Sequence, residues 1–408
     1  MNPADTAWML IATALVLLMT PALAFFYGGL VRSKNALNTM MMSFISLGFV
    51  GVLWAVIGYS LAFTDGSNWL GDTSWALLKD VGFAPKAGTT IPHYLFFAYQ
   101  GTFAIITAAL ISGAIVERMR FSAYVVFISL WAVLVYSPVA HWVWGGGWLA
   151  DMGALDFAGG TVVHVNAGVA ALVAAFCLGP RRDYKKAALV PHNVPFTLLG
   201  AGLLWFGWFG FNAGSAVSAG DLSALAFMTT FLAPMGPLVV WTLLDYMRSG
   251  TPTAVGAATG IVVGLVAVTP AAGYIGPMSA IALGAIAAVP SYFALLWRAK
   301  TNLDDSLDVV AAHGVGGTVG ALLTGVFAQK ALNSAGNDGL LFGNPGQLGV
   351  QATAVVAAIV YSGLVSFILL KIINVVLPLR AAAAEEAIGL DMSQHGEEAY
   401  HTAGSETA

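Results

Sequence analysis

Charged side chains are scarce in this sequence: Asp, Glu, Lys and Arg together make up 9% of its 408 residues. Soluble domains usually carry about a quarter charged residues, so this composition excludes an ordinary soluble domain. Apolar residues make up 58% of the chain, in recurring runs of about 20 residues, the length that crosses a bilayer. We therefore expect an all-α polytopic membrane protein in a lipid bilayer, with no nucleic-acid partner and no enzymatic activity.

Cysteine is also nearly absent, since Cys177 is the only one and lies within an apolar run. A disulfide within the chain and a cysteine metal cluster are therefore excluded, and Cys177 is best interpreted as a small buried apolar side chain. The residues before the first apolar run include Asp5 but no Lys or Arg, with which a secretory signal begins. We expect the first run to be retained as a helix.

The apolar runs predict eleven transmembrane helices, with boundaries uncertain by about 2–4 residues. They span 7–30, 38–63, 94–116, 121–142, 158–178, 195–215, 222–247, 254–271, 275–298, 306–328 and 348–377.

Positive charges test this count. If the N-terminus is outside, the outer segments hold only Lys79, Lys86 and Lys330. The cytoplasmic segments then hold Arg32, Lys34, Arg118, Arg120, Arg181, Arg182, Lys185, Lys186, Arg248, Arg298, Lys300 and Arg380. This asymmetry follows the positive-inside rule and predicts an outside N-terminus and a cytoplasmic C-terminus. A transmembrane domain of residues 1–380 would precede a polar cytoplasmic tail, 381–408, that is either regulatory or disordered.

Two histidines interrupt the apolar pattern in matching contexts. His164 and His313 are each followed by a glycine four residues on, Gly168 and Gly317, and lie in the fifth and tenth predicted spans. Ionisable residues inside membrane spans are functional-site hypotheses by default. The equivalent positions indicate an inverted repeat of five plus five helices with one extra helix, which would bring the two imidazoles together near the middle of the membrane.

The chemistry of such a pair has alternatives. Two neutral rings can share one N–H···N bond and bind a small polar molecule or relay a proton. The simpler interpretation is two unrelated core histidines, each bonded to backbone. Two histidines without carboxylate or cysteine ligands make a poor zinc site, and tightly packed glycine-rich spans leave little room for haem. We therefore expect no metal and no cofactor.

Aromatic residues gather at the predicted outer ends, as in many interfacial belts. A sharper hypothesis concerns Phe103, Trp144 and Ser215, because two aromatic faces and a hydroxyl can hold a small monovalent cation. Asp156 either binds a cation or, as we prefer, accepts hydrogen bonds from the first amides of the fifth span.

Taken together, these segments resemble the ammonium transporter family, which includes the methylammonium permeases and the Rh glycoproteins, and the likeness is to its prokaryotic Amt branch. The resemblance covers nearly the whole chain. It is carried by Phe25–Gly29, Gln100–Phe103, Glu117–Phe121, His141–Gly147, Gly153–Gly160, His164, Gly207–Ser215, Thr269–Tyr274 and His313–Gly317.

The resemblance implies a homotrimer in the cell membrane with one pore per subunit, and ammonium or ammonia as substrate, with methylammonium as an alternative. It assigns Phe103, Trp144 and Ser215 to an outer recruitment site, Phe103 and Phe211 to a gate, His164 and His313 to the pore, and Asp156 to a structural role. It also implies that the tail motif Gly389–Glu397 couples subunits and that a cytoplasmic PII signalling protein blocks the pore.

Two departures from the family pattern stand out. Tyr99 replaces the phenylalanine of many relatives, which we expect to alter the polarity of the outer vestibule without touching the core site. The segment Asp304–Asp308 lacks a cysteine that some relatives carry. A sensor that signals occupancy through its tail, and a haem or metal protein, are the competing function classes.

Overall fold

The computed structural model describes residues 1–400, in which the regular secondary structure is helical and no β-strand is present. The α-helices are α1 (Pro3–Leu30), α2 (Ala36–Leu53), α3 (Tyr59–Phe63), α4 (His93–Ile111), α5 (Phe121–Trp131), α6 (Ser137–Trp144), α7 (Trp148–Asp151), α8 (Asn166–Leu178), α9 (Val194–Ala213), α10 (Asp221–Leu232), α11 (Met235–Ser249), α12 (Ala254–Val268), α13 (Pro277–Lys300), α14 (Gly316–Phe327), α15 (Gly346–Val376), α16 (Ala383–Ile388) and α17 (Leu390–His395). Four π-helical segments join or precede them: η2 (Trp54–Gly58), η5 (Ala132–Tyr136), η6 (Gly160–Val165) and η8 (Val310–Val315).

Each of the eleven predicted spans coincides with a helical segment. Within the described residues, ten segments are long and apolar enough to cross a membrane, and α12, with 15 residues, is shorter. The prediction of an all-helical chain built from apolar spans is confirmed, whereas the exact number of crossings and their direction stay predictions. The last part of the predicted tail, 401–408, lies outside the described residues.

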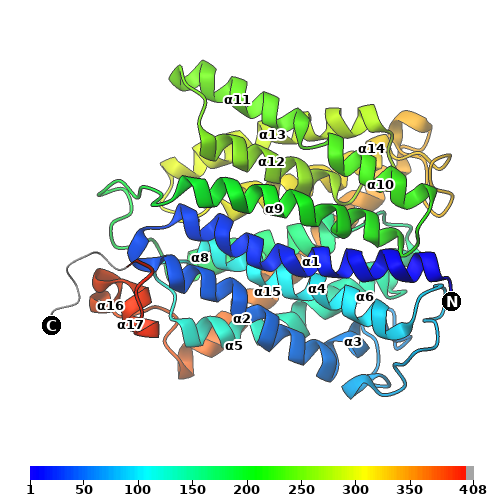
Figure 1. The fold of residues 1–408 in the computed structure, drawn as a ribbon, viewed down its shortest axis with the longest axis horizontal. Helices are drawn as coiled ribbons and strands as arrows, with labels where there is room; N and C mark the ends of the chain where they lie inside the picture. Colours follow the sequence, from blue (N-terminus) through cyan, green and yellow to red (C-terminus); the bar gives the residue numbers. More distant parts are fainter. Residues whose placement is uncertain (401–408) are drawn as a thin grey trace.

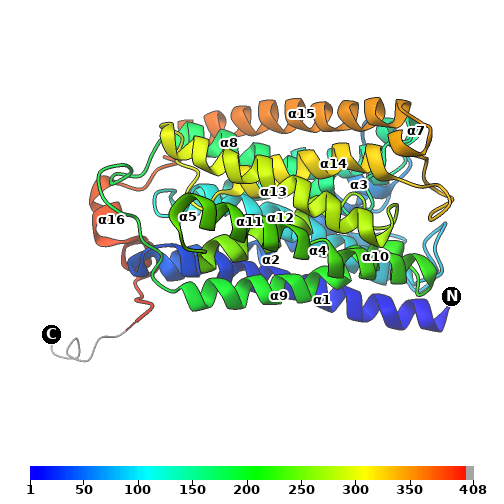
Figure 2. The ribbon, with the colours of Figure 1, turned by 90° about the horizontal axis from the view of Figure 1, so that it is seen from above.

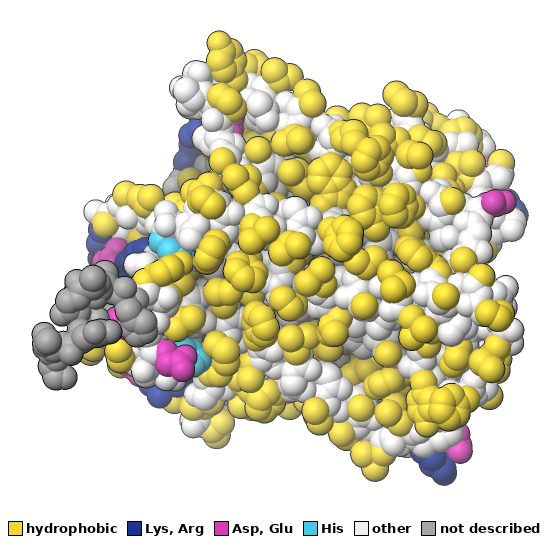
Figure 3. All heavy atoms as spheres, in the orientation of Figure 1, with side chains coloured by type: hydrophobic (Ala, Val, Ile, Leu, Met, Phe, Trp, Pro, Cys, Tyr) yellow, Lys and Arg dark blue, Asp and Glu magenta, His cyan; other side chains and the backbone are white. Residues whose placement is uncertain are grey.

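The long helices run side by side as a bundle, with the N-terminus at one end and α16 and α17 at the other (Figure 1). We call these ends the N-terminal face and the tail face. Seen from above, α15 lies along the flank opposite to α1 and α9 (Figure 2). Hydrophobic side chains cover the visible flank between the two faces (Figure 3). This surface is compatible with lipid, because charged groups are unfavourable inside a bilayer and lie at the ends of membrane-spanning helices.

The two histidine segments cross at the centre of the bundle, where η6 continues into α8 and η8 into α14. Matching glycines allow this approach. A Cβ added to Gly168 would run into the backbone of Gly314, and one added to Gly317 would lie 2.9 Å from His164 Cβ. Small residues let membrane helices pack backbone to backbone, and here they bring together elements 149 residues apart in sequence.

Candidate functional site

The two histidines meet inside the bundle. His164 Nδ1 and His313 Nδ1 lie 3.1 Å apart, and their rings are nearly parallel, with centroids 5.2 Å apart. Both side chains are buried, and His164 Nε2 has no hydrogen-bond partner although it is buried. An unpartnered buried polar atom is costly, so this nitrogen is available to a small polar ligand.

A small cavity runs beside the two rings. Its free volume is about 10 Å³, close to that of one water molecule, and its walls are almost wholly apolar side chains. Trp208 and Phe211 lie on one side of His164 with ring centroids 5.5 Å and 6.1 Å from the imidazole. A narrow dry passage of this kind favours an uncharged species over an ion, because moving a charge out of water is expensive.

Two stacked phenylalanines lie next to this cavity, and Phe211 forms part of its wall. Phe103 and Phe211 stack at 4.1 Å between ring centroids with an interplanar angle of 27°, and both are about 1% exposed. Beyond them, Trp144 meets Phe103 edge to face at 6.0 Å, and its indole N–H donates to the Asp156 carbonyl at 2.8 Å. The aromatic residues singled out in the sequence therefore lie in one continuous cluster.

Ser215 follows the C-terminal end of α9, and its hydroxyl donates to the Phe211 carbonyl at 2.8 Å. Partial negative charge collects at helix C-termini, so this position favours a cation. The prediction for Tyr99 was wrong in one respect. The Tyr99 hydroxyl is buried and contacts Ser215 Oγ at 3.2 Å, while the ring lies 5.0 Å from Phe103, so this residue belongs to the site rather than to the vestibule surface.

Asp156 has the capping role that we preferred. Its carboxylate accepts the backbone N–H groups of Gly159, Gly160, Thr161 and Val162, at 2.5–3.0 Å. These are the amides that have no partner at the start of a helix. The carboxylate therefore fixes the beginning of η6, and with it the place of His164.

Asp305 was missed as a site residue in the sequence. It accepts the N–H groups of Val309 and Val310 at 3.1 and 2.7 Å, so it caps η8 much as Asp156 caps η6. The signal was available, because Asp156 and Asp305 each precede their histidine by eight residues.

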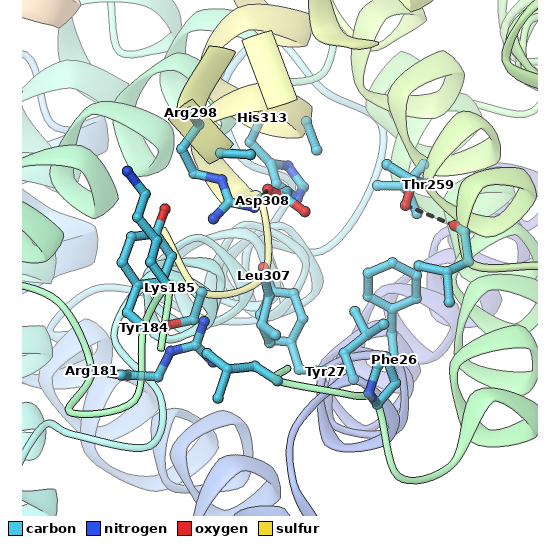
Figure 4. Close-up of a pocket in the computed structure, with 18 of the residues that line it drawn as sticks. Phe26, Tyr27, Arg181, Tyr184, Lys185, Thr259, Arg298, Leu307, Asp308 and His313 are labelled. Atoms are coloured by element: carbon cyan, nitrogen blue, oxygen red, sulfur yellow. Dashed lines mark hydrogen bonds and ion pairs between the residues drawn. The ribbon is translucent and has the colours of Figure 1, made fainter. Parts of the chain in front are cut away.

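On the tail face, a cavity of about 360 Å³ leads down to His313 (Figure 4). Arg181, Lys185 and the ion pair between Arg298 and Asp308, 2.6 Å long, lie along its walls. This cavity shares Phe26, Val262 and His313 with the small cavity beside the histidines, so the two cavities are adjacent.

Buried charges brace this face. Glu117 accepts from Arg32 at 3.1 Å and from Arg181 at 2.9 Å, and Arg181 also pairs with Asp304 at 2.8 Å. Burial opposes ionisation of Glu117, but hydrogen bonding from Arg32 and the charge of Arg181 outweigh it, so the pKa of Glu117 lies below its ordinary value. In the described part of the chain, no group of three or more His, Cys, Asp and Glu side chains is arranged to hold a metal ion.

A bundle of long apolar helices with cavities beside a buried histidine pair is typical of a membrane transport protein. The model of the Ammonium Transporter Family matches residues 7–400, and the chain belongs to that family.

Comparison with individual proteins agrees with this assignment. An ammonium transporter of Bacillus subtilis is 48% identical over 402 residues, covering 98% of this chain and 99% of the relative. The ammonium transporter Amt1 of Archaeoglobus fulgidus is 44% identical over 401 residues, covering 98% of this chain and all of the relative. The crystal structure of Candida albicans Mep2 superposes with a TM-score of 0.90 at 38% identity, covering 98% of this chain and 91% of the other. A structure described as a sensor Amt protein superposes with a TM-score of 0.89 at 29% identity, covering 96% and 98%.

Proposed function

We propose that this protein carries ammonium across the cell membrane. Ammonium would be recruited at the N-terminal face by Trp144, Phe103 and Ser215, lose its proton near the Phe103–Phe211 stack, and pass as ammonia beside His164 and His313. The released proton would either return to the outer side or follow through the two histidines. The observation that carries the proposal is the buried pair of imidazoles, whose Nδ1 atoms lie 3.1 Å apart, between a stacked aromatic pair and a cavity on the tail face.

Selectivity against potassium follows from the same arrangement. Potassium and ammonium are similar in size and charge, but only ammonium can lose a proton. The aromatic faces of Trp144 and Phe103 attract either cation by about 0.5–2 kcal/mol. The apolar passage then excludes potassium, which stays charged, because removing its water shell costs many kcal/mol.

The direction of transport rests on the distribution of positive charge. With the N-terminal face outside, the recruitment site meets the external medium, and the tail face with its many Lys and Arg side chains meets the cytoplasm. The chain would work as a homotrimer with one pore in each subunit, and methylammonium would be an alternative substrate.

Currents recorded from proteoliposomes on a solid-supported membrane test the pathway. If the released proton follows through the histidines, an ammonium pulse gives a current in the wild type that His164→Ala and His313→Ala abolish, because proton transfer along the pair needs both rings. A silent response in a preparation shown to take up ammonium would refute proton transfer through the histidines and leave passage of ammonia alone.

A second role is regulation from the cytoplasm. Within residues 381–400, α17 packs against the first turn of α2, where Asp391 accepts the N–H groups of Leu37 and Asn38 at 3.0 and 2.7 Å, and α16 packs against α17. We propose that this tail couples the pore to neighbouring subunits and that a PII signalling protein docks at the tail-face cavity. A pure sensor is the alternative, favoured by the likeness to the sensor Amt structure; growth of a transport-deficient cell on limiting ammonium, restored by this chain, would argue against it.

A further inference from the structure

Tyr99 ties together the two sides of the recruitment site. It lies on α4 one helical turn before Phe103, and its hydroxyl reaches across to the end of α9. There it lies 2.9 Å from the Gly210 carbonyl, 2.9 Å from the Phe211 carbonyl and 3.2 Å from Ser215 Oγ. The side chain is fully buried, so these bonds are not exchanged for water.

The protons in this cluster can be counted. The Tyr99 and Ser215 hydroxyls each bring one proton, and the acceptors are two carbonyls and the two hydroxyl oxygens. If Tyr99 donates to a carbonyl, Ser215 donates to Phe211 O or to the Tyr99 oxygen. If Tyr99 donates to Ser215, Ser215 donates to Phe211 O. In each case the Ser215 proton points into the protein.

The free lone pair of Ser215 is then left toward the vestibule. If the Ser215 proton turned outward instead, the buried cluster would keep one internal hydrogen bond rather than two, which is unfavourable for acceptors cut off from water. The Gly210 carbonyl also accepts the Gly214 N–H, and the Tyr99 hydroxyl adds a further donor to the carbonyls at the end of α9.

We propose that Tyr99 is a positioning residue for cation recruitment: its hydroxyl, bonded to the end of α9, fixes Ser215 as a hydrogen-bond acceptor for an N–H-bearing cation. This inference rests on the proposed ammonium transport and adds a specificity role for a residue that does not itself bind the cation. Neutral molecules that offer only acceptor atoms cannot donate a hydrogen bond to Ser215, whereas ammonium and methylammonium can donate one from N–H.

The test is a double-mutant cycle on uptake of radiolabelled methylammonium by cells without other ammonium transporters. Tyr99→Phe removes only the hydroxyl and is expected to raise KM about threefold to tenfold, the effect of one neutral hydrogen bond, with the maximal rate unchanged. Ser215→Ala is expected to raise KM as well. The double variant is expected to match Ser215→Ala alone, because Tyr99 acts only through Ser215.

Two further variants support the cycle. Tyr124→Phe is the matched control, since the Tyr124 hydroxyl is buried without a hydrogen-bond partner, and its KM should equal that of the wild type. Gly214→Ala should disturb the same Tyr99–Ser215 hydrogen bond from the end of α9, because an added Cβ would lie 2.7 Å from the Tyr99 hydroxyl. It should raise KM in the same way, and it keeps the inference testable if Tyr99→Phe does not fold.

The outcomes separate this inference from the function it builds on. A raised KM in Ser215→Ala with an unchanged KM in Tyr99→Phe would overturn the positioning role alone, as would multiplying effects in the double variant. An unchanged KM in Ser215→Ala would overturn the recruitment site together with this inference. Absence of uptake by the well-folded wild type would refute transport itself.

Discussion

Asp156 and Asp305 occupy the same place in the two halves of this protein. Each lies eight residues before its histidine, and each accepts backbone N–H groups at the start of that histidine's helical segment. The two central histidines are thus each held by the same arrangement, in which a carboxylate caps a π-helical turn.

Replacing these carboxylates should destabilise the two halves unequally. Asp156 accepts four amides and Asp305 two. Asparagine keeps the shape but exchanges one acceptor oxygen for an NH₂ group, which faces backbone donors and leaves them unpaired, at about 1–3 kcal/mol for each buried group. Asp156→Asn should therefore lower the thermal midpoint of the purified protein more than Asp305→Asn. An equal or reversed order would contradict the capping role inferred here.

The glycines at the crossing give a prediction about packing. Gly168→Ala places a methyl against the backbone of Gly314, which cannot move aside, and overpacking of this kind costs about 1–3 kcal/mol. Gly317→Ala presses instead on the His164 side chain and should reduce transport more than stability. Gly202→Ala on α9 is the matched control, since nothing lies within 4 Å of its added Cβ, and alanine there should be neutral or slightly stabilising. Thermal midpoints and uptake rates for the three variants check this order.

The Phe103–Phe211 stack gives a prediction about selectivity. If this stack is the proposed gate, Phe103→Ala removes one of its rings and gives water and small cations access to the histidines. We expect potassium pulses, silent in wild-type proteoliposomes, to give currents in this variant. Retained exclusion of potassium would show that the barrier lies elsewhere, and the segment around His164 would then be the next place to look.

The ion network on the tail face gives a pH dependence. Glu117 has a pKa below its ordinary value of 4.5, so its ionised form is favoured by folding. Its contribution is complete above about pH 4.5 and is lost as pH falls through the lowered pKa of the folded state. Between pH 7 and about pH 5 this contribution should therefore stay constant, and below that range it should decline.

Glu117→Gln tests the same network at neutral pH. The variant removes the carboxylate that Arg181 and Arg32 share. Arg181 keeps Asp304 and Arg32 keeps Asp183, so the cost should be at most that of breaking a buried pair, about 3–5 kcal/mol. Thermal midpoints measured from pH 4 to 7 should be lower than in the wild type at neutral pH and should lose the part of the acid dependence that comes from Glu117. A wild-type-like midpoint at pH 7 would show that the two arginines find other partners.

Composition and spacing alone predicted the class of this protein and identified its central pair, His164 and His313. Long apolar runs with few charges are stable in lipid, and two histidines in matched glycine-containing segments predicted that two distant spans meet. These features are local in sequence, or repeat at a fixed spacing, and so can be recognised without coordinates.

The neighbours of Tyr99 and Glu117 could be identified only from the tertiary structure. Tyr99 looked like a conservative change on a vestibule wall, and its bond to Ser215, 116 residues away, depends on how α4 and α9 are placed side by side. The partners of Glu117 likewise come from segments that are far apart along the chain. Hydrogen bonds and ion pairs depend on separations of about 3 Å between groups that the chain brings together only on folding, and spacing along the sequence carries no measure of that distance.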